Sequence, residues 1–286
     1  MINDFLSSWA LFHNTYLAGY LIAVLLSIIG VLVTARDQIF LGAAVSQAST
    51  LGIALAMWAA ACLDGPGFGW LHSDTFPSVM AVLFCVAASL FTWRGGKPAK
   101  ESYEAATGWV FLLSAAFSIL IVSKSPHGLE EIYRLMSSNI IGATTRDVGV
   151  FSALLLLTVF FFALHRRRLL LLALDPEMTI AVQMNRKLWE SLISLWLGLV
   201  VGLSMRTSGM LFTFGCMVLP SLIAKNLCRA VGTIFYAAPL FAFAASAFAF
   251  ILANYYDCPP AQMTIGLLCV CLGLAWLKPG RRIRAQ

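Results

Sequence analysis

The residues best suited to chemistry within an apolar stretch occur in the segment "LGAAVSQAST". Ser46, Gln47, Ser49 and Thr50 fall within five positions, and no charged residue occurs between residues 38 and 63. Hydroxyl and amide groups of this kind can contact a polar solute, or they can hydrogen-bond a neighbouring helix. The rest of the chain decides between these two roles.

Helical spacing divides this segment into two faces. Residues three, four or seven positions apart lie on one side of a helix. A face of small residues suits close helix packing, and the other face carries the amide that could meet a solute. The first face holds Gly42, Ser46 and Ser49, and the second holds Ala43, Gln47 and Thr50.

The composition is that of a polytopic membrane protein. Hydrophobic residues make up 60% of the 286 residues and charged residues only 11%, whereas soluble domains carry about 25% charged residues. The net charge of +6 lies in short clusters between apolar runs, which the positive-inside rule explains. We therefore expect membrane lipid as a partner and no nucleic acid.

Nine spans of about 20 apolar residues are predicted. With the N-terminus outside and the C-terminus inside, 15 of the 19 Lys and Arg residues lie on the cytoplasmic side. Residues 1–14 are predicted as an interfacial helix, and the whole chain as one all-α transmembrane domain. The spans lie near 16–35, 40–62, 77–93, 108–123, 148–164, 189–205, 208–224, 232–253 and 261–277.

Two connections are longer than a turn. Residues 125–147 lie outside and mix apolar with charged residues, which predicts an outer helix or loop. Residues 165–188 lie inside and contain the helix-start signal Asp175-Pro176-Glu177. Asp caps the helix, Pro fits its first turn, and Glu suits the positive end of its dipole.

The sequence contains no energy source of its own. The spans hold essentially no ionisable residue that could bind a coupling ion, and no GxxxxGK(S/T) loop binds ATP. No span pairs a serine with a base, so an intramembrane enzyme is disfavoured. A transport protein of this kind needs a second subunit to supply energy. The competing class is a secondary carrier for a small neutral solute.

Four segments in order resemble the metal-ion ABC permease family. They are "GVLVTARDQIFLGAAVSQASTLGIALA", "LDPEMTIAVQ", "SGMLFTFGCMVLPSLIAKNL" and "PPAQMTIGLL". The resemblance implies a type II importer-like permease in the bacterial inner membrane that carries manganese, zinc, iron or a chelate. It also implies two ATPase subunits that hold ATP and Mg, an extracytoplasmic solute-binding protein, and a second permease chain, identical or related. No cofactor is expected on this chain.

By the same resemblance, residues 175–186 form a coupling helix that docks on the ATPase. The family usually has alanine at Thr179 and glycine at Gln183, so this docking surface is bulkier and more polar. The coupling residues implied in this way are Asp175, Pro176, Glu177, Thr179, Val182 and Gln183.

The resemblance fails at the pair that would hold a metal. The family places Asp and His where this chain has Ala43 and Gln47, and an amide is a poor ligand for zinc or manganese. We consider three explanations, in this order. The partner chain or other polar groups hold the ion, or the cargo is a chelate or another small polar solute, or Gln47 merely hydrogen-bonds a neighbouring helix.

The remaining candidates are weaker. Pro220 should kink the seventh span and free a backbone carbonyl, which either lines the path or only curves the helix. Several polar residues of the outer loops could contact the binding protein, although a solvated loop or an interfacial helix explains them equally simply. They are His72, Asp74, His127, Glu130 and Glu131.

Overall fold

The chain forms an all-helical membrane protein. The computed structural model describes residues 2–62, 70, 75–95, 102–123, 140–174, 178–228 and 230–277, and the regular elements within these ranges are helices. Eight of them are long and apolar enough to cross a membrane. They are α1 (Ile2–Ala35), α2 (Ile39–Cys62), α3 (Thr75–Gly95), α4 (Tyr103–Val122), α6 (Thr145–Leu174), α8 (Arg186–Leu227), α9 (Val231–Tyr255) and α10 (Pro260–Leu277).

Helix α8 contains two segments of spanning length. Its 42 residues are about twice the number needed for one crossing. Gly209 interrupts the helical backbone with φ 74° and ψ 174°, a conformation that glycine adopts without the penalty of a Cβ. The interruption lies inside the predicted span 208–224, one residue from that span's start. It supports two crossings in place of one, and the total of nine spans stays a prediction.

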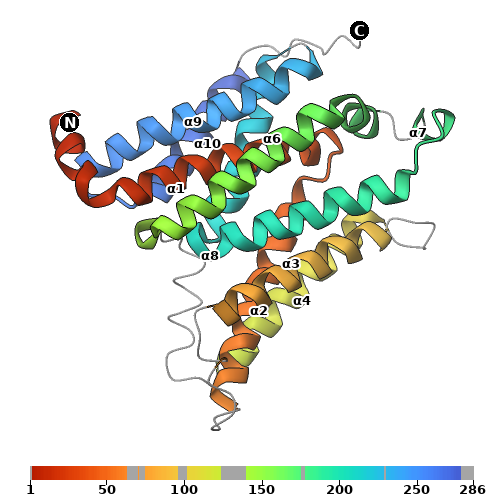
Figure 1. Cartoon of the computed structure of the whole chain (residues 1–286), viewed down its shortest axis with the longest axis horizontal. Coiled ribbons are helices and arrows are strands. Elements are labelled where there is room, and N and C mark those ends of the chain that lie inside the picture. The colour runs from red at the N-terminus through yellow and green to blue at the C-terminus, as the bar shows by residue number, and fades with distance from the viewer. Residues whose placement is uncertain are drawn as a thin grey trace. The chain divides into compact units, whose positions relative to one another are not determined.

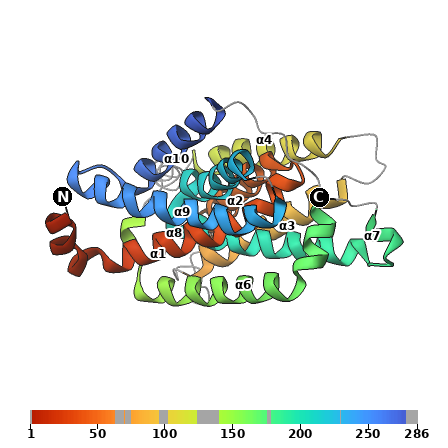
Figure 2. The same cartoon turned by 90° about the horizontal axis from the view of Figure 1, so that it is seen from above.

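The helices group into two compact units. Unit 1 comprises Met1–Asp37, Ser138–Met184 and Leu211–Gln286, and unit 2 comprises Gln38–Ser137 and Asn185–Met210. In unit 1, α1 packs against α6 and α9, and α9 packs against α10 (Figures 1 and 2). In unit 2, α2 packs against both α3 and α4.

Unit 1 is built around a close approach of α1 to the second half of α8. A Cβ atom on Gly30 would overlap the carbonyl oxygen of Met217. Beside this contact, the Ser221 hydroxyl donates to the carbonyl of Ser27 at 3.3 Å. Glycine at position 30 therefore lets two backbones touch, as small residues do in membrane helix pairs.

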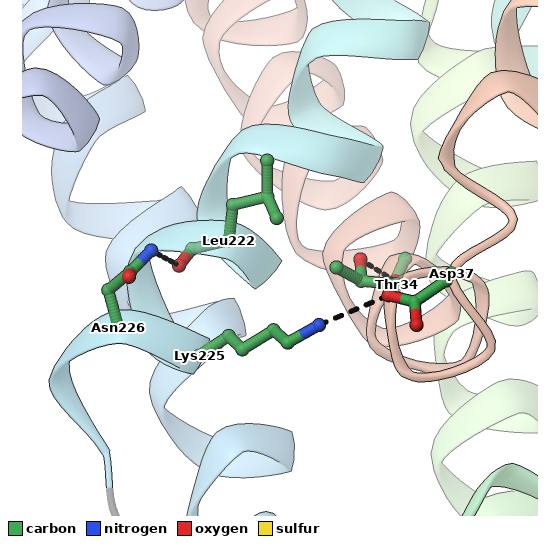
Figure 3. Close-up of polar contacts among 6 residues, drawn as sticks. Thr34, Asp37, Leu222, Lys225 and Asn226 are labelled. Carbon is green, nitrogen blue, oxygen red and sulfur yellow. Dashed lines mark hydrogen bonds and ion pairs between the residues drawn. The ribbon is translucent and has the colours of Figure 1, made fainter. Parts of the chain in front are cut away.

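An ion pair joins the ends of the same two helices. Lys225 Nζ lies 3.2 Å from Asp37 Oδ1, and both side chains are substantially exposed (Figure 3). Asp37 follows the end of α1 and has a left-handed backbone, with φ 52°. Exposed pairs of this kind contribute at most about 1 kcal/mol, so the Gly30 packing holds the helices together and the ion pair is an addition.

Two helices extend beyond the predicted spans. α1 is helical from Ile2 without a break, so residues 2–14 form one helix with the first span, and their interfacial position stays a prediction. α6 continues to Leu174, ten residues past its predicted end, with non-helical angles at His165. Leu169 and Leu172 are buried and extend the packing surface beyond that point. Of the segment 125–147, residues 140–147 are described, and they include the 3-10 helix η2 (Ile140–Gly142).

Candidate functional site

Helix α2 is enclosed on both of its predicted faces. Every residue from Leu41 to Ala54 is buried, and Ala43 and Gln47 are only 6% and 4% exposed. The sequence distinguished a packing face from a solute-facing face. In this structure neither face is open, so the polar groups of α2 lie in the protein interior.

Helix α3 covers one side of α2. A Cβ atom on Gly52 would lie 2.5 Å from the Met80 carbonyl oxygen, and the Cys85 thiol donates to the Val45 carbonyl at 3.2 Å. Val45 and Gly52 are seven residues apart and share a face. This is the face on which α2 and α3 approach most closely.

Helix α4 covers the side that carries Gln47. Phe40 packs against Phe111 with ring centroids 5.3 Å apart, and Ala54 packs against Val122. Gln47 lies seven residues from both Phe40 and Ala54, so the three side chains share one face of α2. We infer from this register that the amide of Gln47 faces the middle of α4.

The matching face of α4 is a line of hydroxyls that the sequence prediction missed. Thr107, Ser114 and Ser118 are buried on one face of α4 together with Val110 and Val122. Ser118 donates to the Ala115 carbonyl at 2.9 Å. The spacing of 107, 114 and 118 was a usable signal, because these positions share one helical face in an otherwise apolar span.

Two described serine hydroxyls of unit 2 have no hydrogen-bond partner. The Oγ atoms of Ser46 and Ser204 are buried and unpaired, whereas the Thr50 hydroxyl makes a long bond of 3.4 Å to the Ser46 carbonyl. An unsatisfied buried hydroxyl costs about 1–3 kcal/mol. These groups are neutral donors and acceptors that a passing polar solute could use.

The described residues offer no metal-binding cluster. Among them, no three His, Cys, Asp or Glu side chains come together. Amide and hydroxyl oxygens cannot by themselves replace the hydration of a bare divalent ion, which needs charged or imidazole ligands. The polar groups described on α2 and α4 are neutral hydrogen-bond donors and acceptors.

Pro220 is buried in the part of α8 that belongs to unit 1, whereas α2 belongs to unit 2. The non-helical backbone within α8 is at Gly209 and not at Pro220. Pro220 lies within the helix beside the Ser221–Ser27 contact, and the kink expected there stays a prediction.

The predicted coupling segment contains a four-residue helix, α7 (Met178–Ala181). Thr179 is fully buried, whereas Met178 and Val182 are 53% and 63% exposed. Residues four apart share a helix face, so these two apolar side chains form one exposed surface. Asp175, Pro176 and Glu177 lie outside the described residues.

Gln183 ends α7 in a left-handed conformation. Its φ is 54°, and the amide of Met184 donates to the Thr179 carbonyl at 3.0 Å. This is the Schellman arrangement, in which the left-handed position favours glycine. A non-glycine residue there costs about 1–2 kcal/mol, which gives a physical reason for the glycine expected at this position.

The outer-loop candidates are not placed. His72, Asp74, His127, Glu130 and Glu131 lie outside the described residues. Their predicted contact with a binding protein stays a prediction.

Known proteins share this sequence pattern and fold. A membrane protein of Treponema pallidum (strain Nichols), named "Probable metal transport system membrane protein", is 24% identical over 277 residues, 96% of this chain and 98% of the relative. The structure of PsaBC from Streptococcus pneumoniae in complex with Fab matches with a TM-score of 0.79 at 15% identity, over 96% of this chain and 95% of that one.

A second solved structure is described as "An inward-facing conformation of a putative metal-chelate type ABC transporter". It matches with a TM-score of 0.69 at 17% identity, over 93% of this chain and 85% of that chain. The model of the ABC 3 transport family matches residues 8–277. The chain therefore belongs to the ABC 3 transport family and is a multi-pass plasma-membrane permease, a transport component and not an enzyme.

Proposed function

We propose that this permease imports manganese, zinc or iron, as the ion or as a chelate, with a separate ATPase and an extracytoplasmic binding protein. Two permease chains, identical or related, form the path, with nine spans each and the N-terminus outside. The match of the family model over residues 8–277 carries this proposal. The relatives named for metal and metal-chelate transport point to the same class of cargo.

In this proposal, α2 offers no charged ligand to the passing cargo. Gln47 faces the hydroxyl line of α4, and buried unpaired hydroxyls on α2 and α8 supply further neutral contacts. These groups suit a chelate, whose metal is already coordinated, or an ion whose ligands come from the second permease chain. The location of Gln47 against α4 also fits the third explanation, in which its amide only hydrogen-bonds the neighbouring helix.

ATP hydrolysis is coupled through α7. Met178 and Val182 present an exposed apolar surface while buried Thr179 anchors the segment. An exposed pair of this kind on a short helix suits insertion into a groove of the ATPase. Movement of this segment would open the path to one side of the membrane at a time.

Co-purification tests the coupling role. Scrambling residues 175–182, or introducing Met178→Glu with Val182→Glu, should release the ATPase from the detergent-solubilised complex. Gln183→Gly is the matched control, because it keeps the exposed surface and suits the left-handed backbone. An ATPase that stays bound to the scrambled chain, with transport unaffected, would favour the secondary carrier instead.

Elemental analysis tests the cargo. Cells that lack this chain should contain less manganese, zinc or iron when each metal is limiting. Supply of the missing metal as a preformed chelate separates import of the ion from import of the chelate. Unchanged contents of all three metals would contradict the metal assignment and favour a small non-metal polar solute.

A further inference from the structure

We propose that one end of α6 and the start of α9 bind the phosphate headgroup of an anionic phospholipid. The site consists of Arg166, Arg167 and Arg168 on α6, with Gly232 and Tyr236 on α9. All of these residues belong to unit 1. The assignment of this lipid site to the cytoplasmic leaflet rests on the proposed orientation of the permease. The binding chemistry of the site does not depend on that orientation.

The helix that carries the arginines presents an apolar surface suited to lipid. Leu156, Phe160 and Leu164 are 72%, 64% and 67% exposed, and α6 is the least buried of the eight candidate spans. Apolar side chains exposed over this length of a membrane helix fit acyl chains. A lipid tail could therefore lie along α6 directly before the basic residues.

The backbone changes at the point where the apolar surface ends. His165 has non-helical angles of φ −110° and ψ 16°, and the following three arginines are exposed. An open pocket of about 630 Å³ is lined by residues 163–168. The turn at His165 thus places guanidinium groups around a space at the end of the lipid-facing segment.

Arg166 is held in position by α9. Its guanidinium carbon lies 5.7 Å from the centroid of the Tyr236 ring, and Nη1 donates to the Tyr236 hydroxyl at 3.4 Å. A Cβ atom on Gly232 would come within 3.2 Å of Nη2, so glycine leaves the guanidinium its space. Tyrosine with a polar tip and an apolar ring is typical of the membrane–water boundary.

The positive charge is not balanced by the helices that bear it. The only acidic residue of α6 is Asp147, in its first turn, and α9 has none. Guanidinium groups match phosphate oxygens well, so three neighbouring arginines favour an anionic ligand.

The start of α9 adds to the attraction. Its N-cap residue, Ala230, makes no side-chain capping bond at the start of this 25-residue helix near Gly232, although the Thr233 amide already donates to the Ala230 carbonyl at 3.0 Å. The positive end of the helix dipole favours an anion there. A phosphodiester with two acyl chains satisfies both the basic and the apolar parts of the site, whereas a free phosphate satisfies only the first.

Lipid affinity measured on the purified full chain tests this proposal. The wild-type protein in neutral detergent should bind fluorescent phosphatidylglycerol at least about tenfold more tightly than fluorescent phosphatidylcholine. Arg166→Gln with Arg167→Gln and Arg168→Gln should remove this preference. Arg206→Gln is the matched control, since Arg206 is exposed in unit 2 and its loss should change nothing.

Gly232→Ala and Tyr236→Leu keep the test valid if the triple variant fails to fold. Each should weaken phosphatidylglycerol binding several-fold, because one crowds the Arg166 guanidinium and the other removes its aromatic support. Equal affinity for the two lipids, or unchanged binding by the folded variants, would overturn the proposal. So would displacement of the lipid by equimolar inorganic phosphate, which would indicate a soluble-anion site.

The ATPase provides the last arm of the experiment. If the triple variant kept its lipid preference but lost the ATPase, the arginines would be a subunit contact and the lipid site would be wrong. If it lost the preference and kept the ATPase, the site would be supported. Neither result depends on metal transport, so failure of this proposal is distinguishable from failure of the proposed function.

Discussion

Helices α1 and α2 are both largely buried, yet their chemistry is opposite. The interior residues of α1 are mostly large and aliphatic, among them Ile22, Leu25, Leu26 and Ile29. Those of α2 are mostly Gly, Ala, Ser and Thr, with Gln47 in the middle. Buried side chains in a membrane protein need not be apolar, because apolar side chains on the outside already lie in lipid and gain little from burial.

The comparison separates a structural helix from a candidate path helix. α1 packs large aliphatic side chains into unit 1 and approaches α8 most closely at Gly30, whereas α2 keeps the unpaired Ser46 hydroxyl at a cost to stability. Polar groups that are retained at such a cost are functional candidates. The following predictions test this division, from the largest expected effect to the smallest.

Gly30→Val should have the largest effect. Its side chain would overlap the Met217 carbonyl, a backbone atom that cannot move without displacing α8. We expect loss of the folded, monodisperse protein in size-exclusion chromatography. Gly108→Ala is the control, since a Cβ atom there meets nothing within 4 Å. A folded Gly30→Val protein with unchanged melting temperature would show that the α1–α8 contact is not the basis of unit 1.

Leu26→Ala and Ser46→Ala should act in opposite directions. Leu26 is fully buried, and its truncation should lower the free energy of unfolding by about 2–5 kcal/mol through lost contacts and a cavity. The Ser46 hydroxyl is buried without a partner, so its removal should be neutral or stabilising by about 1 kcal/mol. Chemical denaturation in detergent measures both. A costly Ser46→Ala change would mean that this hydroxyl is structural.

Ala43→Asp should destabilise the protein by about 2.5–3.5 kcal/mol, because it places a carboxylate in the enclosed interior of a membrane helix. The double variant Ala43→Asp with Gln47→His restores the pair implied by the family resemblance. Its melting temperature should rise with added manganese or zinc, while that of the wild type should not. If neither metal raises the melting temperature of the double variant, positions 43 and 47 do not hold the metal in this system.

Gln47→Leu should change stability by less than about 1.5 kcal/mol, because the two side chains have similar volumes. It removes the amide that faces α4, so uptake of the limiting metal should fall at least several-fold if this face contacts the cargo. Gln47→Asn is the matched control that keeps an amide. Full uptake by the folded Gln47→Leu protein would reduce Gln47 to a packing residue.

Lys225→Gln should have the smallest effect. The ion pair with Asp37 is exposed on both sides, so its loss should cost less than about 1 kcal/mol, and the cost should decrease with added salt. Thermal unfolding at low and high salt measures this difference. A loss comparable to that of Leu26→Ala would make the ion pair, and not the packing at Gly30, the main link at this end of α1.

The sequence predicted the helices well because lipid imposes one rule on every span. A backbone in hydrocarbon must satisfy its own hydrogen bonds, so each apolar run of about 20 residues becomes a helix. The runs at 40–62 and 232–253 correspond closely to α2 and α9. The end of α6 was placed too early. A prediction based on apolarity ends a span at the first charged residues, such as Arg166, although the helix itself continues to Leu174.

The candidate site was predicted only in part. The polar face of α2 is visible as spacing within one segment, and the family resemblance marked Ala43 and Gln47. The α4 hydroxyls were missed because the importance of Ser114 and Ser118 depends on the packing of α4 against α2. Helix periodicity carries no information about which helices become neighbours.

The sequence by itself determined a helical membrane protein, because length and apolarity are local properties, and the absence of a metal-ligand pair at Ala43 and Gln47 stays a prediction. Only the tertiary structure decided which helices meet: that Gly30 lies on Met217, that α2 packs against α4, and that Arg166 lies against Tyr236. Helices in lipid gain little from burying apolar surface, so close packing and hydrogen bonds select their partners. These interactions depend on side chains from distant segments.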